Sequence, residues 1–114
     1  MKPTLISLLF WLSVTTSAAA DLEAIWIDVR TLAEYEGGHL PGAHNIKFDR
    51  IGAHISEITT DKNALVMLYC KSGRRSGFAK QILEQLGYSN VVNAGGINDV
   101  LRQAQTLPSA GSSP

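Results

Sequence analysis

The single cysteine of this 114-residue chain, Cys70, lies between an apolar segment and a short cationic loop. The apolar segment covers residues 65–69, and the loop reads Lys71-Ser72-Gly73-Arg74-Arg75-Ser76. If a strand, a tight turn and a helix follow one another here, backbone N–H groups surround the sulfur at a helix N-terminus. The helix dipole favours negative charge at that point. Such surroundings convert an ordinary thiol into a thiolate nucleophile.

Nucleophilic chemistry at Cys70 requires a lowered thiol pKa. A free thiol has a pKa of about 8.5, so only about 3% of it is ionised at pH 7. A fall of about two units gives roughly 75% thiolate and corresponds to about 2.7 kcal/mol of preferential stabilisation of the anion. Loop N–H groups, the helix N-terminus and Arg74 or Arg75 can supply this together. The alternative is a buried structural cysteine that completes a strand.

Charge in this chain is balanced, with ten basic and ten acidic residues, but four cations gather around the cysteine: Lys71, Arg74, Arg75 and Lys80. Cations in the first turn of a helix oppose its dipole, and an anionic ligand or a thiolate would resolve that conflict. A nucleic-acid binder normally shows a basic excess. We therefore expect no nucleic-acid partner.

Apolar segments rich in β-branched residues predict strands at residues 24–29, 43–46, 64–69 and 90–93. Helices are predicted at 31–36, 51–58 and 98–105, and from the cysteine loop to residue 86, with Phe78, Ala79, Ile82, Leu83 and Leu86 on one face. This alternation predicts a small α/β domain with a mostly parallel central sheet flanked by helices. The cysteine loop and two glycine turns, 37–42 and 94–96, follow strands. They should converge at the carboxyl ends of the sheet.

Helix boundaries carry their own signals. Thr31 and Glu34 have the spacing of a capping box, and we interpret Glu34 as a cap and not as a general acid. Asp49 is expected to cap the helix over residues 51–58. Gly87 is expected to end the helix that follows the cysteine loop, in the left-handed conformation.

The two ends of the chain predict segments outside the folded domain. Residues 1–20 have a positive start at Lys2, an apolar run and Ala18-Ala19-Ala20, which together indicate a cleaved export signal. Residues 21–106 form the predicted domain, and residues 107–114 read as a disordered tail. In an exported protein an unpaired cysteine suggests a reactive thiol or an intermolecular link. No second cysteine is present to resolve a mixed disulfide, which argues against a dithiol oxidoreductase.

Three motifs resemble those of the single-domain rhodaneses, which are thiosulfate sulfurtransferases. The cysteine loop is similar to their active-site loop. Upstream, Asp28-Val29-Arg30, Glu34-Tyr35 and Gly38–Ala43 resemble one family signature, and downstream Gly87-Tyr88 and Asn93-Ala94-Gly95-Gly96 resemble another. The resemblance implies a rhodanese-like domain and, with the export signal, a periplasmic location without membrane association after cleavage. Many members carry tryptophan where this chain has Val100, which should cost packing under the last helix.

The resemblance also implies a reaction. The Cys70 thiolate takes the outer sulfur of thiosulfate, or of another sulfane-sulfur anion, and releases sulfite. It then passes the sulfur from a persulfide to a small thiophilic acceptor, cyanide or a thiol. Substrate would bind to Lys71, Ser72, Gly73, Arg74, Arg75 and Ser76, and no cofactor is required. Asp28 and Arg30 are expected to form a supporting ion pair.

Two other functions stay open. A persulfide carrier or anion-binding module would begin with the same chemistry. A cysteine phosphatase or arsenate reductase has five residues between cysteine and arginine, whereas Arg75 follows Cys70 after four, which favours a smaller group than phosphate. We expect no metal site, because Pro41-Gly42 separates His39 from His44 and no third ligand is evident.

Overall fold

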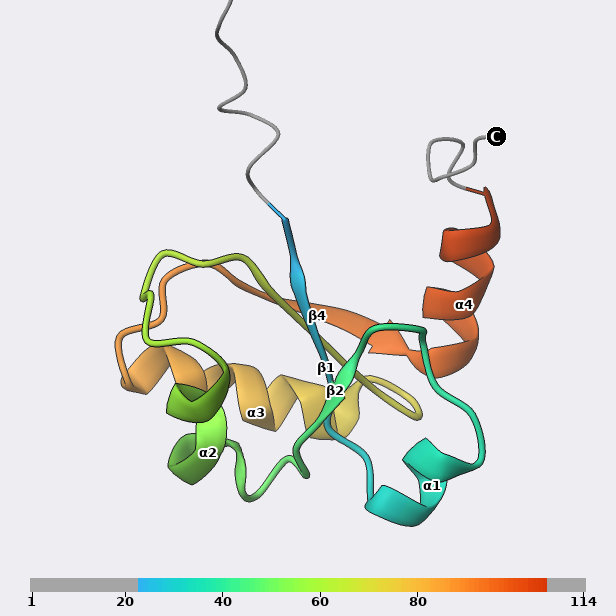
Figure 1. Ribbon diagram of the computed structural model, residues 1–114, viewed down its shortest axis with the longest axis horizontal. Coiled ribbons are helices and arrows are strands. Elements are labelled where there is room, and N and C mark those ends of the chain that lie inside the picture. Colours follow the sequence, from blue (N-terminus) through green and yellow to red (C-terminus); the bar gives the residue numbers. More distant parts are fainter. Residues whose placement is uncertain (1–22, 107–114) are drawn as a thin grey trace, which may run out of the picture.

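The computed structural model describes residues 23–106, so the predicted export signal and tail lie outside the described residues. The elements follow the order β1 (Ile25–Asp28), α1 (Leu32–Glu36), β2 (His44–Asn45), α2 (Ile51–Ile58), β3 (Val66–Cys70), α3 (Arg74–Gln85), β4 (Val91–Gly96) and α4 (Ile97–Thr106). All strand pairs are parallel, in the order β2-β1-β3-β4 (Figure 1). The predicted α/β fold with a parallel sheet is confirmed. None of these helices is long and apolar enough to cross a membrane.

The two faces of the sheet bury separate apolar clusters. On one face, α2 and α3 pack against alternate residues of β1 and β3, such as Ile27 and Leu68. On the other face, Tyr69 of β3 and Val100 of α4 pack with Trp26 and Leu40. Strand β3 pairs with both β1 and β4 and is buried on both faces. Cys70, its last residue, therefore ends the central part of the sheet.

Helix α1 begins as its sequence predicts. The Thr31 hydroxyl accepts a hydrogen bond from the Glu34 N–H at 3.2 Å, and the Glu34 carboxylate accepts one from the Thr31 N–H at 3.0 Å. Both halves of the capping box are formed, so the prediction is confirmed. Gly87 adopts a φ of 99°, as expected of a left-handed residue just beyond α3.

The predicted cap of α2 is wrong. Arg50, not Asp49, occupies the N-cap position, and no side chain caps the helix. Asp49 instead lies 3.7 Å from the Lys47 ammonium group, and both side chains are about half exposed. The Arg50 N–H donates to the Lys47 carbonyl at 2.8 Å. This turn places Asp49 one residue before the cap position.

The buried face of α3 differs from the predicted one. Ser76, Ala79 and Leu83 are buried, whereas Phe78 is 52% exposed and Leu86 is 43% exposed. The helix faces the sheet through Ser76 because that residue contacts the end of β3. Positions three and seven residues further along then share this face. The predicted face is correct for Ala79, Ile82 and Leu83 and wrong for Phe78 and Leu86, because apolar character alone does not reveal the contact made by the polar Ser76.

The glycines at residues 94–96 belong to β4 and do not form the predicted turn. Gly95 pairs with Tyr69 and Gly96 with Cys70, after a register shift between Leu68 and Tyr69. Strand β4 therefore continues as far as the cysteine and does not turn away before it. As a result, Gly95 and Gly96 lie beside the start of the cysteine loop at the carboxyl end of the sheet.

An apolar cavity lies beneath α4. Its volume is about 270 Å³, and Val100, Trp26, Leu40, Pro41 and Ala104 contribute to its walls. Val100 itself is 2% exposed. The cavity is at the position where we expected valine, in place of tryptophan, to weaken the packing.

We predict that Val100→Phe stabilises the protein. A larger apolar side chain fills part of the cavity, and such changes commonly add about 1 kcal/mol to the free energy of unfolding. Thermal denaturation should show a melting temperature higher by roughly 4–8 °C for a domain of this size. Val92→Phe is the matched control because Val92 is 37% exposed. A melting temperature that falls in Val100→Phe, or rises equally in both variants, would contradict the role of the cavity.

Candidate active site

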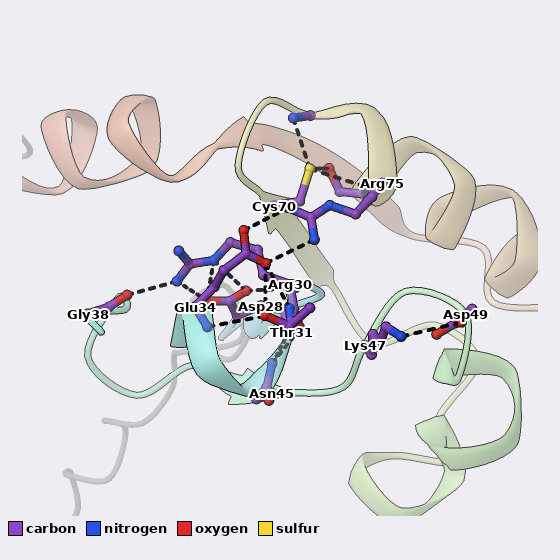
Figure 2. A network of polar contacts seen from close by, with 12 residues as sticks. Asp28, Arg30, Thr31, Glu34, Gly38, Asn45, Lys47, Asp49, Cys70 and Arg75 are labelled. Carbon is purple, nitrogen blue, oxygen red and sulfur yellow. Dashed lines mark hydrogen bonds and ion pairs between the residues drawn. The ribbon is translucent and has the colours of Figure 1, made fainter. Parts of the chain in front are cut away.

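Three donor groups from two residues lie within hydrogen-bond distance of Cys70 Sγ. The Gly73 N–H lies 2.9 Å from the sulfur, the Ser76 N–H 3.4 Å and the Ser76 hydroxyl 3.5 Å. The cysteine itself has no exposed surface. We call these three groups the donor shell; Figure 2 shows the sulfur and its hydrogen bonds.

The sulfur occupies the place of a helix cap. Gly73 is the N-cap residue of α3 and has no side chain to accept the free N–H groups of the first turn. An N-cap side chain normally accepts from the second or third helical N–H. Ser76 is the third residue of α3, and its N–H points to Cys70 Sγ. The cysteine at the end of β3 therefore caps the following helix, and a negative charge on its sulfur is favoured there.

Burial and hydrogen bonding shift the thiol in opposite directions. Burial raises the pKa of Cys70, whereas hydrogen bonds from the Ser76 hydroxyl and from the N–H groups of Ser76, Ser72 and Gly73 lower it. The hydrogen bonds prevail, and the pKa of the thiol lies below its ordinary value. The group thus has the electrostatic character of a nucleophile and not of an inert core cysteine.

Glycines allow the cysteine loop to lie against β4. A Cβ on Gly96 would lie 2.4 Å from the Lys71 carbonyl oxygen, a distance that non-bonded atoms do not tolerate. Gly73 has a φ of 98°, a left-handed conformation that a side chain would strain, and it packs against the Gly95 backbone. The Gly-Gly pair of β4 is needed because the loop backbone passes directly over it.

The cations of the cysteine loop have different roles in the structure. Lys71 and Arg74 are exposed, and within the described part of the chain no ion pair or hydrogen bond engages either side chain. Arg75, in contrast, donates two hydrogen bonds to the Glu34 carboxylate, at 2.9 and 3.1 Å (Figure 2). Only Lys71 and Arg74 are left to attract an anion from solvent.

Glu34 has a second partner that its sequence position did not reveal. Besides capping α1, it accepts the hydrogen bonds of Arg75, which lies 41 residues further along the chain. Arg75 and the Thr31 N–H lower the pKa of Glu34 to about 2, so the ion pair persists at neutral pH. No local signal could have found this contact, because it depends on the first turn of α3 coming within reach of α1 in the folded chain.

The predicted Asp28–Arg30 ion pair is present at the end of β1. The Arg30 guanidinium lies 2.6 Å from the Asp28 carboxylate, and both side chains are buried. Arg30 also donates to the Gly38 carbonyl at 2.8 Å. The pair supports the glycine turn at residues 37–42 and does not contact Cys70 through any hydrogen bond among the described residues.

Between residues 23 and 106 there is no group of three histidine, cysteine or acidic side chains that could hold a metal ion. His39 stacks on Tyr35 with ring centroids 3.6 Å apart, and its Nδ1 lies 2.8 Å from the Tyr35 carbonyl. His44 is exposed on β2. The two histidines thus have separate surroundings.

Comparison with known proteins identifies the class of this fold and site. The model of the rhodanese-like domain matches residues 15–103 of the chain, so the protein belongs to the rhodanese-like domain family. The resemblance that the three motifs carried is confirmed.

Individual relatives narrow the class to sulfurtransferases. The chain is 45% identical over 75 residues to the thiosulfate sulfurtransferase PspE of Escherichia coli. This alignment covers 66% of this chain and 72% of the relative. It is 36% identical over 84 residues to a sulfurtransferase of Allochromatium vinosum, covering 74% and 77% of the two chains. Among solved structures, a rhodanese with anions from E. coli matches with a TM-score of 0.66 and 44% identity. That match covers 68% of this chain and 91% of the other.

We predict that Gly96→Ala weakens the donor shell. The new Cβ pushes the Lys71 carbonyl away from β4, which moves the cysteine loop and its N–H groups relative to the sulfur. The thiol pKa, measured by the ultraviolet absorbance of the thiolate during titration, should rise by about one unit, a tenfold change in the ionisation constant. Gly37→Ala is the control, because a Cβ there meets its nearest atom at an ordinary 3.5 Å. An unchanged titration in a folded Gly96→Ala variant would show that the close approach does not position the donors.

Proposed function

We propose that this protein is a thiosulfate sulfurtransferase that carries sulfur as a persulfide on Cys70. The observation that supports the proposal most is the position of Sγ, which accepts hydrogen bonds from Gly73 and Ser76 at the N-terminus of α3. This arrangement favours the thiolate, the form that attacks sulfur. Two sulfurtransferases among the relatives support the reaction class.

In the first half-reaction, the Cys70 thiolate attacks the outer sulfur of thiosulfate. A bond forms between Sγ and that sulfur, the sulfur–sulfur bond of thiosulfate breaks, and the electron pair leaves with sulfite. The persulfide keeps one negative charge, and sulfite takes two. The persulfide charge lies on the outer sulfur, next to Sγ at the N-terminus of α3, where the helix dipole also favours negative charge.

In the second half-reaction, a nucleophilic acceptor attacks the terminal sulfur of the persulfide. With cyanide, a carbon–sulfur bond forms, thiocyanate leaves, and the electron pair of the broken sulfur–sulfur bond returns to Sγ. The enzyme alternates between thiolate and persulfide, which gives ping-pong kinetics.

Lys71 and Arg74 are the cations that attract the thiosulfate dianion in this proposal. Both are exposed beside a cysteine that has no exposed surface. Thiosulfate therefore reaches Sγ only when residues of the cysteine loop shift, and surface cations concentrate the anion before that step. Arg75 contributes less to this attraction, because Glu34 neutralises its charge.

Mass spectrometry tests the persulfide. Incubation with thiosulfate should add about 32 Da, the mass of one sulfur, to the peptide that contains Cys70, with one sulfite released per chain. Cys70→Ser should show neither change while it retains the circular dichroism spectrum of the folded protein. Sulfite release limited to one turnover despite excess cyanide would favour the persulfide carrier instead. Faster turnover of a phosphate ester than of thiosulfate would overturn the proposal.

Steady-state kinetics test the two exposed cations. Lys71→Ala and Arg74→Ala together should raise KM for thiosulfate about tenfold, about 1.4 kcal/mol, with a smaller effect on kcat, because they act on binding of the dianion. High salt should reduce the difference from the unmodified protein. Lys62→Ala is the control for loss of a positive charge, since Lys62 precedes β3 at the end opposite Cys70. An unchanged KM in the double variant would remove both residues from the binding site.

A further inference from the structure

All three members of the donor shell depend on one side chain of β4. Gly73 and Ser76 supply the three donor groups that lie within hydrogen-bond distance of Cys70 Sγ. The Asn93 side chain bonds to both of them. Its Nδ2 donates to the Gly73 carbonyl at 2.9 Å, and its Oδ1 accepts from the Ser76 hydroxyl at 2.6 Å.

The Asn93 side chain is itself fixed from its own strand. Its Oδ1 accepts a second hydrogen bond from the Gly95 N–H at 3.0 Å, two residues along the chain. An amide oxygen has two acceptor positions, and Ser76 and Gly95 occupy both. The amide therefore has a defined orientation, with its nitrogen toward Gly73.

Both sides of the Gly73 residue are then held. Its N–H points to Cys70 Sγ, while its carbonyl accepts from Asn93 Nδ2 and from the Gly77 N–H at 3.1 Å. Gly73 has a left-handed conformation and no side chain, so no side-chain contact of Gly73 fixes the direction of its N–H. The bond to Asn93 supplies this restriction from a neighbouring strand.

We propose that Asn93 is a positioning residue that holds Gly73 and Ser76 in the orientation in which they donate hydrogen bonds to Cys70 Sγ. It does not bond to the sulfur. It joins the cysteine loop to β4, and through Ser76 it controls the one hydroxyl in the donor shell. The sequence marked Asn93 as part of a downstream motif but assigned it no role.

The Ser76 hydroxyl has only one hydrogen to donate. It lies 2.6 Å from Asn93 Oδ1 and 3.5 Å from the sulfur, so Asn93 accepts it in the structure described here. The hydrogen bond to Asn93 fixes the Ser76 side chain in the orientation in which its oxygen lies 3.5 Å from Sγ.

The first test measures the ionisation of Cys70, which does not require thiosulfate turnover. Because Cys70 is the only cysteine, the thiolate absorbance of the full chain reports on this group alone. Asn93→Ala should lower the ionisation constant of the thiol about threefold, equivalent to a rise of about half a unit in its pKa. Asn90→Ala is the matched control, since Asn90 precedes the same strand and its side chain makes no hydrogen bond among residues 23–105.

A second variant distinguishes the loss of one hydrogen bond from unfolding of the protein. Asn93→Asp keeps an acceptor for Ser76 and Gly95 but cannot donate to the Gly73 carbonyl, and it adds negative charge beside the sulfur. It should reduce the thiolate fraction more than Asn93→Ala does. An unchanged titration in either variant, with the circular dichroism spectrum of the folded protein, would overturn the role of Asn93.

A double-variant cycle distinguishes positioning from a general loss of stability. If Asn93 acts through the donors, its effect on the thiol should shrink by at least about twofold in a Ser76→Ala background, because one of the two positioned residues has lost its hydroxyl. Equal effects in both backgrounds would overturn the coupling.

Kinetics extend the test to the proposed function, on which this last prediction alone rests. Asn93→Ala should lower kcat for sulfur transfer and leave KM for thiosulfate within about twofold, because the hydrogen bonds of Asn93 go to Gly73, Ser76 and Gly95 and not to Lys71 or Arg74. A raised KM with an unchanged thiol titration would instead make Asn93 a substrate-binding residue. If the protein lacks thiosulfate turnover, the titration still decides the positioning role.

Discussion

The hydrogen bonding of Cys70 Sγ to the first turn of α3 is the interaction on which the rest of the site depends. A helix start leaves N–H groups without partners, and the N-cap glycine of α3 has no side chain to accept them. The sulfur of Cys70, at the end of the preceding strand, accepts hydrogen bonds from two of these N–H groups. One interaction therefore completes the helix and favours the reactive charge state of the thiol, so stability and chemistry are not in conflict here.

That interaction requires three chain segments to meet at the carboxyl end of the sheet. The cysteine loop lies against β4 only because Gly96 leaves room for the Lys71 carbonyl. On the other side, Glu34 of α1 holds Arg75 of α3. The buried Asp28–Arg30 pair supports the glycine turn that follows α1. These ion pairs fix the loops, and within the cysteine loop Lys71 and Arg74 are the cations that stay exposed without an ion pair.

Most sequence signals within a single segment predicted structure well, with the Asp49 cap as an exception, and signals that needed a neighbouring segment did not. The capping box at Thr31 and Glu34 and the left-handed Gly87 depend on residues a few positions apart, and both are present. The predicted apolar face of α3 is only partly correct, because contact with the end of β3 buries the polar Ser76 and leaves Phe78 exposed. Gly95 and Gly96 resembled a turn, yet pairing with β3 keeps them in a strand.

The sequence by itself determined that a lone cysteine ends a strand and begins a cationic, glycine-containing loop before a helix, and this was enough to indicate a thiolate. Only the tertiary structure decided which groups act on that thiolate. Arg75 is neutralised by a residue 41 positions away, and Asn93 reaches Gly73 across 20 residues. The physical reason is that loop and helix geometry follow from local backbone hydrogen bonds. The partners of a side chain, in contrast, depend on which distant segments the packed sheet brings together.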